Sequence, residues 1–236
     1  TYPVVAFGMI VLIAAGLIIW VVPQFAEIFK SFDKALPAPT QLLIDVSEIL
    51  RSWKIFVVIA AAIAGIIGFR AYRETTNGRY QTDAMMLKLP VFGKLLRKVS
   101  ISRFARTLST LTRSGVSILA ALEIVERTAG NEVFARVVRK AGDSVRGGET
   151  LAEPLARSQE FPAMVTRMIG VGEKTGALEQ MLAKISDFYD SEVKAAVDGL
   201  TSLIEPILIL MMGIVVGGIV IALFMPILQL SSLVSQ

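Results

Sequence analysis

Three long stretches without a charged side chain limit what this chain can fold into. They cover residues 1–22, 55–69 and 206–230. About 20 apolar residues in a helix span a bilayer, and flanking basic and aromatic side chains extend a shorter run into the interface. A hydrophobic fraction of 54% is also typical of a membrane protein. We therefore expect an all-α membrane protein with transmembrane helices at 1–22, 55–70 and 205–230.

Basic residues just after the second stretch predict the orientation. Arg70, Arg73 and Arg79 follow it closely, and basic residues near the ends of a span favour the cytoplasmic side. The large polar block of the chain is therefore expected in the cytoplasm. The other expected segments are a linker at 71–89, a cytoplasmic domain at 90–204, an external loop at 23–54 and an external tail at 231–236.

The block at 90–204 has the pattern of an antiparallel six-helix bundle. Apolar residues recur three and four positions apart, and glycines separate these runs. Ser117 and Asn131 stand where they can cap the second and third helices. The last helix has no breaker before Gly199 and is expected to run towards the third span. The expected helices cover about 101–115, 118–129, 131–145, 150–156, 162–174 and 176–199, with the short loops of a bundle.

Composition excludes several kinds of chemistry. The chain has no cysteine and no histidine, which removes the commonest metal ligand and general base. The glycine-rich stretch 170–176, GVGEKTG, is not a phosphate loop, because Glu173 stands where the motif needs glycine and no strand precedes it. We expect an interhelix turn there, with Glu173 and Lys174 exposed as candidate partner contacts. No cofactor, metal or nucleic acid is expected.

A row of arginines lies on the first helix of the bundle. Arg103, Arg106 and Arg113 fall opposite the apolar face of that helix, at spacings of three and seven. One interpretation is a solvated face. The other is a contact with lipid phosphates or with an acidic partner, and the sequence leaves both open.

Two features of the third stretch are candidate contacts within the membrane. Gly213 and Gly217 form a GxxxG pair that lets another helix approach closely, although glycine is frequent in transmembrane helices in general. Glu205 stands at the start of the stretch. It is either an interfacial carboxylate in water or part of an ion pair with another helix or subunit. The stretches offer no ionisable partner deeper in the membrane, which argues against a transporter.

Several separated motifs resemble one family. They are LPVFGKLLRKVSISRFARTLSTLTRSGVSILAALEIV at 89–125, GEKTGALEQML at 172–182, and the IEPILI and MPI segments between 204 and 227, together with VVPQFAEIF and LPAPTQLL after the first stretch. The chain is similar to the polytopic inner-membrane platform proteins of type IV pilus and type II secretion systems. That family has two related six-helix cytoplasmic domains, so this chain resembles its C-terminal part without the first domain. Its last segment looks more like the pilus branch.

The resemblance implies a non-enzymatic platform in the bacterial inner membrane, with 23–54 and 231–236 in the periplasm. Such a platform couples a hexameric cytoplasmic assembly ATPase to the insertion or extraction of pilin subunits. The implied partners are that ATPase, inner-membrane alignment proteins, pilin or pseudopilin subunits, membrane lipid and further copies of the chain. The alternatives are the equivalent platform of type II secretion and, in a different class, a membrane transporter subunit.

Overall fold

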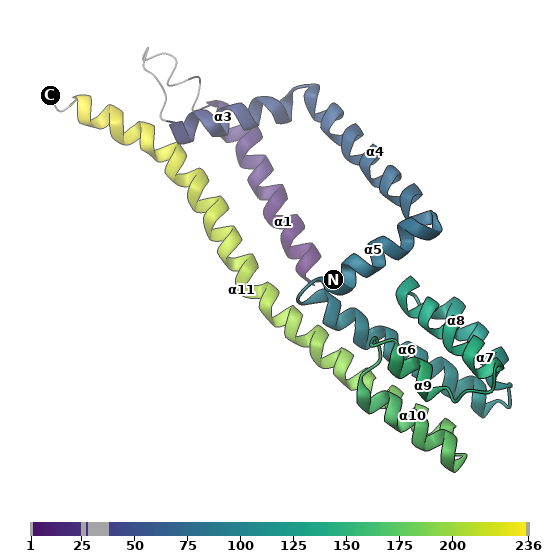
Figure 1. Cartoon of the computed structure of the whole chain (residues 1–236). Coiled ribbons are helices and arrows are strands. Elements are labelled where there is room, and N and C mark those ends of the chain that lie inside the picture. The colour runs from purple at the N-terminus through teal and green to yellow at the C-terminus, as the bar shows by residue number, and fades with distance from the viewer. Residues whose placement is uncertain (1, 25–26, 28–37, 235–236) are drawn as a thin grey trace. The chain divides into compact units, whose positions relative to one another are not determined.

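The computed structural model describes residues 2–24, 27 and 38–234, and every regular element among them is a helix (Figure 1). The all-α prediction is confirmed. The chain divides into two compact units. One, the membrane unit, comprises Thr1–Ile67 and Gly199–Gln236, and the other, the bundle, comprises Gly68–Asp198.

The membrane unit contains the helices that are long and apolar enough to cross a bilayer. Its described elements are α1 (Tyr2–Gly16), the π-helix η1 (Leu17–Val21), α3 (Ala38–Arg51), the greater part of α4 (Lys54–Glu74) and the end of α11 (Leu178–Val234). Among the described residues, three candidate spans meet the criteria of length and composition, at Val4–Gln24, Lys54–Glu74 and Leu178–Met225. The three predicted spans are therefore confirmed as candidates, and each helix reaches beyond the stretch read from sequence.

A small apolar core holds the membrane unit together. Val22, Ile219 and Leu223 are its buried residues, and the hydroxyl of Thr40 on α3 donates a hydrogen bond to the carbonyl of Ala222 on α11 at 2.5 Å. The loop expected at 23–54 contains helix α3, while its residues 25–26 and 28–37 lie outside the described residues. The expected tail at 231–236 is helical up to 234, and 235–236 are not described.

The bundle consists of the helices expected from periodicity and one more. They are α5 (Thr76–Lys88), α6 (Phe92–Arg113), α7 (Ile118–Thr128), α8 (Glu132–Arg146), α9 (Ala152–Arg157), α10 (Ala163–Thr175) and the beginning of α11. Ser117 and Asn131 cap α7 and α8 as predicted: the Ser117 hydroxyl accepts from the Ala120 N–H, and the Asn131 amide oxygen accepts from the Val133 N–H. Helix α11 continues past Gly199, as expected.

The extra helix lies in the segment expected to be a linker. Residues 76–88 form α5, which Thr75 caps by accepting a hydrogen bond from the Gly78 N–H. The helix buries Asp83 and Leu87 and packs against α6 and α8. The periodicity of this segment is weak, because its few apolar residues do not keep to one face of the helix. The linker expected at 71–89 is thus mostly part of the bundle.

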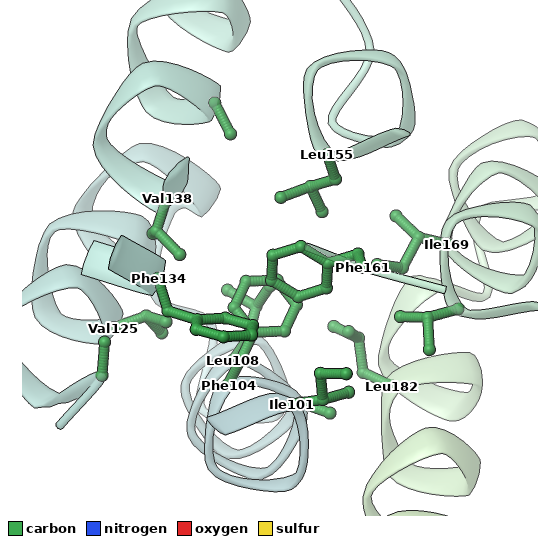
Figure 2. Packing of buried hydrophobic residues seen from close by; sticks show 14 of the residues in the cluster. Ile101, Phe104, Leu108, Val125, Phe134, Val138, Leu155, Phe161, Ile169 and Leu182 are labelled. Carbon is green, nitrogen blue, oxygen red and sulfur yellow. The ribbon is translucent and has the colours of Figure 1, made fainter. Parts of the chain in front are cut away.

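Three phenylalanines meet at the centre of the bundle (Figure 2). The rings of Phe104 and Phe134 both pack edge-on against Phe161, with centroids 4.9 and 5.4 Å away. Leu182 of α11 and Leu155 of α9 are fully buried in the same core. Aromatic pairs in this geometry add about 0.5–1.5 kcal/mol beyond their burial. This core fixes the positions of the surface residues described next.

Candidate functional site

The arginines of α6 point towards two different neighbours. Arg106 forms an ion pair with Asp190 of α11, and Arg113 forms one with Glu179 of α11 at 2.8 Å. Arg103 is exposed, and its guanidinium lies against Gly130, where a Cβ atom would come within 2.2 Å of its Nη1. That position is just after the C-terminus of α7, where a cation is favourable. The three arginines do not act as one stripe.

Polar contacts continue along the whole boundary between α6 and α11, which we call the α6–α11 seam. The Lys98 ammonium lies 2.7 Å from the Glu192 carboxylate, and the Ser102 hydroxyl donates to Asp190 at 2.5 Å. Residue numbers rise along α6 while those of their partners fall, so the two helices are antiparallel. The side chains of Arg106 and Arg113 are 64% and 66% exposed, so their charges stay within reach of a partner.

The two charged residues of the GVGEKTG turn have different surroundings. Glu173 is half-buried, and its two carboxylate oxygens accept hydrogen bonds from the N–H groups of Leu151 and Ala152 at 2.5 and 3.0 Å. These groups begin α9, which has no side-chain cap of its own. The expectation that Glu173 is exposed was therefore wrong. Lys174 is exposed, as predicted, and has no ion pair within the described part of the chain.

The turn itself is closed by glycine. Gly176 ends α10 with a φ of +73°, a conformation that costs glycine little and other residues more. Lys174 precedes it in the last turn of α10, where the helix dipole favours a cation. The turn thus holds the Lys174 ammonium at the surface.

Asp83 is a buried carboxylate that the sequence analysis did not single out. It is 3% exposed. One carboxylate oxygen forms an ion pair with the Arg73 guanidinium at 2.7 Å, and the other accepts a hydrogen bond from the Glu132 N–H at the start of α8 at 2.8 Å. A buried carboxylate is stable only with such partners. The partner on α8 is 49 positions away, so local sequence offers no signal for this contact.

A groove of about 720 Å³ lies beside α8 in the bundle. Its lining includes Tyr80, Arg136, Arg139, Lys140 and Arg157. The Arg136 guanidinium stacks 4.0 Å above the Tyr80 ring. The hydrogen bond that Arg139 donates to the Glu126 carboxylate, together with the charge of that carboxylate, raises the pKa of Arg139 above its ordinary value. The groove is therefore basic, although each of its three arginines has a carboxylate partner. The described residues contain no cluster that could hold a metal.

The candidate contacts in the third span face away from the rest of the described chain. A Cβ atom added at Gly213 or Gly217 would meet nothing within 4 Å. The buried residues Ile219 and Leu223 lie on another face of α11. Glu205 is exposed and forms no ion pair with a described residue. These three residues stay predictions of contacts with other molecules.

Comparison with known proteins gives consistent matches along almost the whole chain. The chain is 41% identical over 231 residues to the type IV pilus assembly protein PilC of Myxococcus xanthus, covering 98% of this chain and 55% of the relative. Its identity to PilC of Thermus thermophilus is 42%, over 98% and 57% of the two chains. The type II secretion system protein F of Pseudomonas aeruginosa is 36% identical, over 99% and 57%.

The relatives are longer than this chain, which spans little more than half the length of those three. The family model described as "Type II secretion system (T2SS), protein F" matches residues 104–226. That range begins inside α6 and covers α7 to α10 and most of α11, and it is 123 of the 236 residues. The match thus includes the phenylalanine core, the part of the α6–α11 seam that Arg106 and Arg113 form, and the third candidate span. The chain therefore belongs to the type II secretion system protein F family, which includes the PilC pilus assembly proteins.

Proposed function

We propose that this chain is the membrane-embedded part of a non-enzymatic assembly platform for a type IV pilus. The platform transmits the work of a cytoplasmic hexameric ATPase to pilin subunits that enter or leave the membrane. The observation that carries this proposal is an identity of 41–42% to two PilC proteins over 98% of the chain, against 36% to a protein F. The bundle would lie in the cytoplasm of a bacterium and the three spans in its inner membrane.

Helix α11 offers a physical route for this coupling. It contributes Leu182 and Ile185 to the bundle core and Ile219 and Leu223 to the membrane core. One helix is thus anchored by packing at both ends. A force that a partner applies to the bundle would act directly on the helix that carries the third span.

Deletion of the gene in its own host tests the pilus assignment. We expect surface pili to disappear while pilin remains in the membrane, with protein secretion into the medium unchanged. Loss of secretion with normal pili would instead favour the type II secretion platform. Normal pili and normal secretion would contradict both and leave the transporter alternative.

The non-enzymatic role has a biochemical test. The purified chain in nanodiscs should hydrolyse no ATP, because the GVGEKTG segment lies in a helix and its turn and lacks the phosphate-loop pattern. Added to the cognate assembly ATPase, the chain should change the rate of hydrolysis. Hydrolysis by the chain alone would contradict the proposal.

The exposed cations of the bundle are the proposed contacts for the ATPase and the alignment proteins. Lys174 and Arg103 carry this proposal best, because both are exposed and neither has an ion pair among the described residues. Lys174→Glu should weaken a pull-down of the ATPase, whereas Lys184→Glu, an exposed lysine on α11, should not. Equal effects of the two variants would mean that binding depends on the net charge of the bundle and that Lys174 makes no specific contact.

Contacts with pilin or with further copies of the chain are proposed for the third span. Gly217→Leu should reduce crosslinking between spans, because it fills the surface of the GxxxG pair. Gly218→Leu is the matched control, since its surroundings are equally open.

Glu205→Gln should reduce pilus assembly at normal protein levels if Glu205 pairs with a partner, and wild-type assembly would leave it as an interfacial carboxylate.

A further inference from the structure

The turn between α5 and α6 exposes a group of large apolar side chains. We call residues 85–94 the α5–α6 corner (Figure 1). Its exposed apolar residues are Met85 (69%), Met86 (42%), Leu89 (46%), Val91 (50%) and Phe92 (59%). Single exposed apolar residues are normal, but a cluster of this kind marks a surface that contacts another protein or a membrane.

The backbone of the corner holds these side chains outward. Leu89 is extended before Pro90, as expected for a residue that precedes proline, and its carbonyl accepts from the Gly93 N–H at 2.9 Å. A Cβ atom at Gly93 would stand only 2.2 Å from the carbonyl oxygen of Leu87, so α6 starts in direct contact with the end of α5. The close contact at Gly93 therefore fixes how α5 and α6 meet, and the large apolar side chains of the corner are exposed there.

The charged residues within the corner are all basic. No Asp or Glu occurs from 84 to 122, a range that contains seven basic residues. Within the corner, Lys88 and Lys94 are exposed and have no ion pair with any described residue. An apolar tip beside free cations is complementary to a bilayer surface that contains anionic lipid, where apolar groups enter the interface and lysines meet phosphates.

The chain keeps this corner close to a bilayer. The candidate span α4 ends at Glu74 and α5 begins at Thr76. Helix α5 has 13 residues, which at about 1.5 Å per residue makes roughly 20 Å. A surface within that reach of the membrane meets lipid at a far higher local concentration than it meets a partner in solution.

We propose that the α5–α6 corner is a lipid-binding element, inserted into the headgroup region of the bilayer that α4 crosses. The apolar side chains of Val91 and Phe92 enter the interface, and Lys88 and Lys94 bind the phosphates of anionic lipids. This contact gives the bundle a second attachment to the membrane beside its covalent connections. This inference rests on the proposed function, because it requires α4 to cross the bilayer. It extends that function to the recognition of anionic lipid.

Spin labels can measure this insertion directly, because the chain contains no cysteine and a single introduced cysteine is unique. Val91→Cys carries the label at the corner, with Met85→Cys as a second position. Val171→Cys on α10 is the matched control, since Val171 is 53% exposed against 50% for Val91. Ile63→Cys reports whether α4 itself is in the membrane. The full chain is placed in vesicles of phosphatidylcholine and phosphatidylglycerol, and collisions with oxygen and with a water-soluble nickel chelate are compared.

We expect the label at Val91 to collide often with oxygen and rarely with the nickel chelate, as a label in a bilayer does, while the label at Val171 behaves as in water. Water-like collisions at Val91 with bilayer-like collisions at Ile63 would overturn the lipid contact and leave the proposed membrane topology intact. Shielding of Val91 from both reagents would also overturn it, because protein would then cover the corner. Water-like collisions at Ile63 would refute the topology and the inference together.

The lysines provide a second test. Each lysine near an anionic surface contributes on the order of a fivefold preference for the bound state. Lys88→Gln combined with Lys94→Gln should therefore weaken insertion at Val91 by roughly 25-fold in vesicles with phosphatidylglycerol, and little in phosphatidylcholine alone. Lys184→Gln should change neither. An equal response in the two lipids would refute recognition of anionic lipid.

Discussion

Helices α4 and α6 are almost equally long and have opposite surroundings. Helix α4 has 21 residues and buries none of them, whereas α6 has 22 and buries eight. The apolar residues of α4 surround the helix, while most of those of α6 after the exposed Phe92 keep to the side that faces the core. An all-round apolar helix needs lipid or other helices to cover it, and an amphipathic one packs on its own domain. The comparison indicates that the bundle is stabilised by its own core and the membrane unit mainly by what surrounds it.

The largest expected effect tests this difference with one residue type. Phe104→Ala should destabilise the bundle by about 3–5 kcal/mol, because it empties the centre of a packed core; Phe104 is 2% exposed. Phe56→Ala on α4 should leave the bundle unchanged, since Phe56 is 71% exposed. Hydrogen exchange of the α6 and α10 amides, measured on the full chain in nanodiscs, reports the change in bundle stability that each of the two variants causes. Equal losses of protection would contradict the independence of the bundle core.

A second test compares two glycines inside the bundle. Gly93→Ala should cost roughly 1–3 kcal/mol, because the new methyl group collides with the Leu87 backbone, which cannot move as a side chain would. Gly142→Ala on α8 meets only Leu122 at 3.9 Å, and should be neutral or stabilise by up to about 1 kcal/mol. Chemical denaturation followed by near-UV circular dichroism distinguishes them. A neutral Gly93→Ala would show that the α5–α6 corner is not held tightly.

Features that depend on neighbouring residues could be predicted from the sequence. The three candidate spans follow from length and composition, and the bundle helices follow from periodicity. The caps Ser117 and Asn131 were predicted because a cap acts within three residues of itself. The same local signals explain why the continuation of α11 past Gly199 was predicted.

Features that depend on distant segments could not be predicted. Asp83 is a stable buried carboxylate because Arg73 and the Glu132 N–H at the start of α8 come to meet it, and Glu173 becomes half-buried because α9 starts beside it. Helix α5 was missed for the same reason, since its stability comes from α6 and α8. Arg106 and Arg113 lie opposite the apolar face of their own helix, and nothing in that helix shows that α11 supplies their carboxylates.

The neighbours Glu173 and Lys174 test how much a distant contact contributes. Glu173→Gln should destabilise the bundle by about 1–3 kcal/mol, since the charged hydrogen bonds to the Leu151 and Ala152 N–H groups are weakened. Lys174→Gln should leave stability within about 0.5 kcal/mol, as expected for an exposed residue. Thermal denaturation of the two variants gives the comparison. If Glu173→Gln were as stable as the parent, α9 would not depend on this cap.

The smallest expected effect concerns the α6–α11 seam. Arg113→Gln should cost about 0.2–1 kcal/mol, because exposed ion pairs are weak, and the Arg113 side chain is 66% exposed. A double-mutant cycle with Glu179→Gln isolates the interaction, which should decrease further at high salt. A coupling well above this range would mean that the seam stabilises α11 as strongly as the buried core does. With the expected weak coupling, Leu182 and Ile185 hold α11 on the bundle, and a partner could displace the seam contacts without unfolding the core.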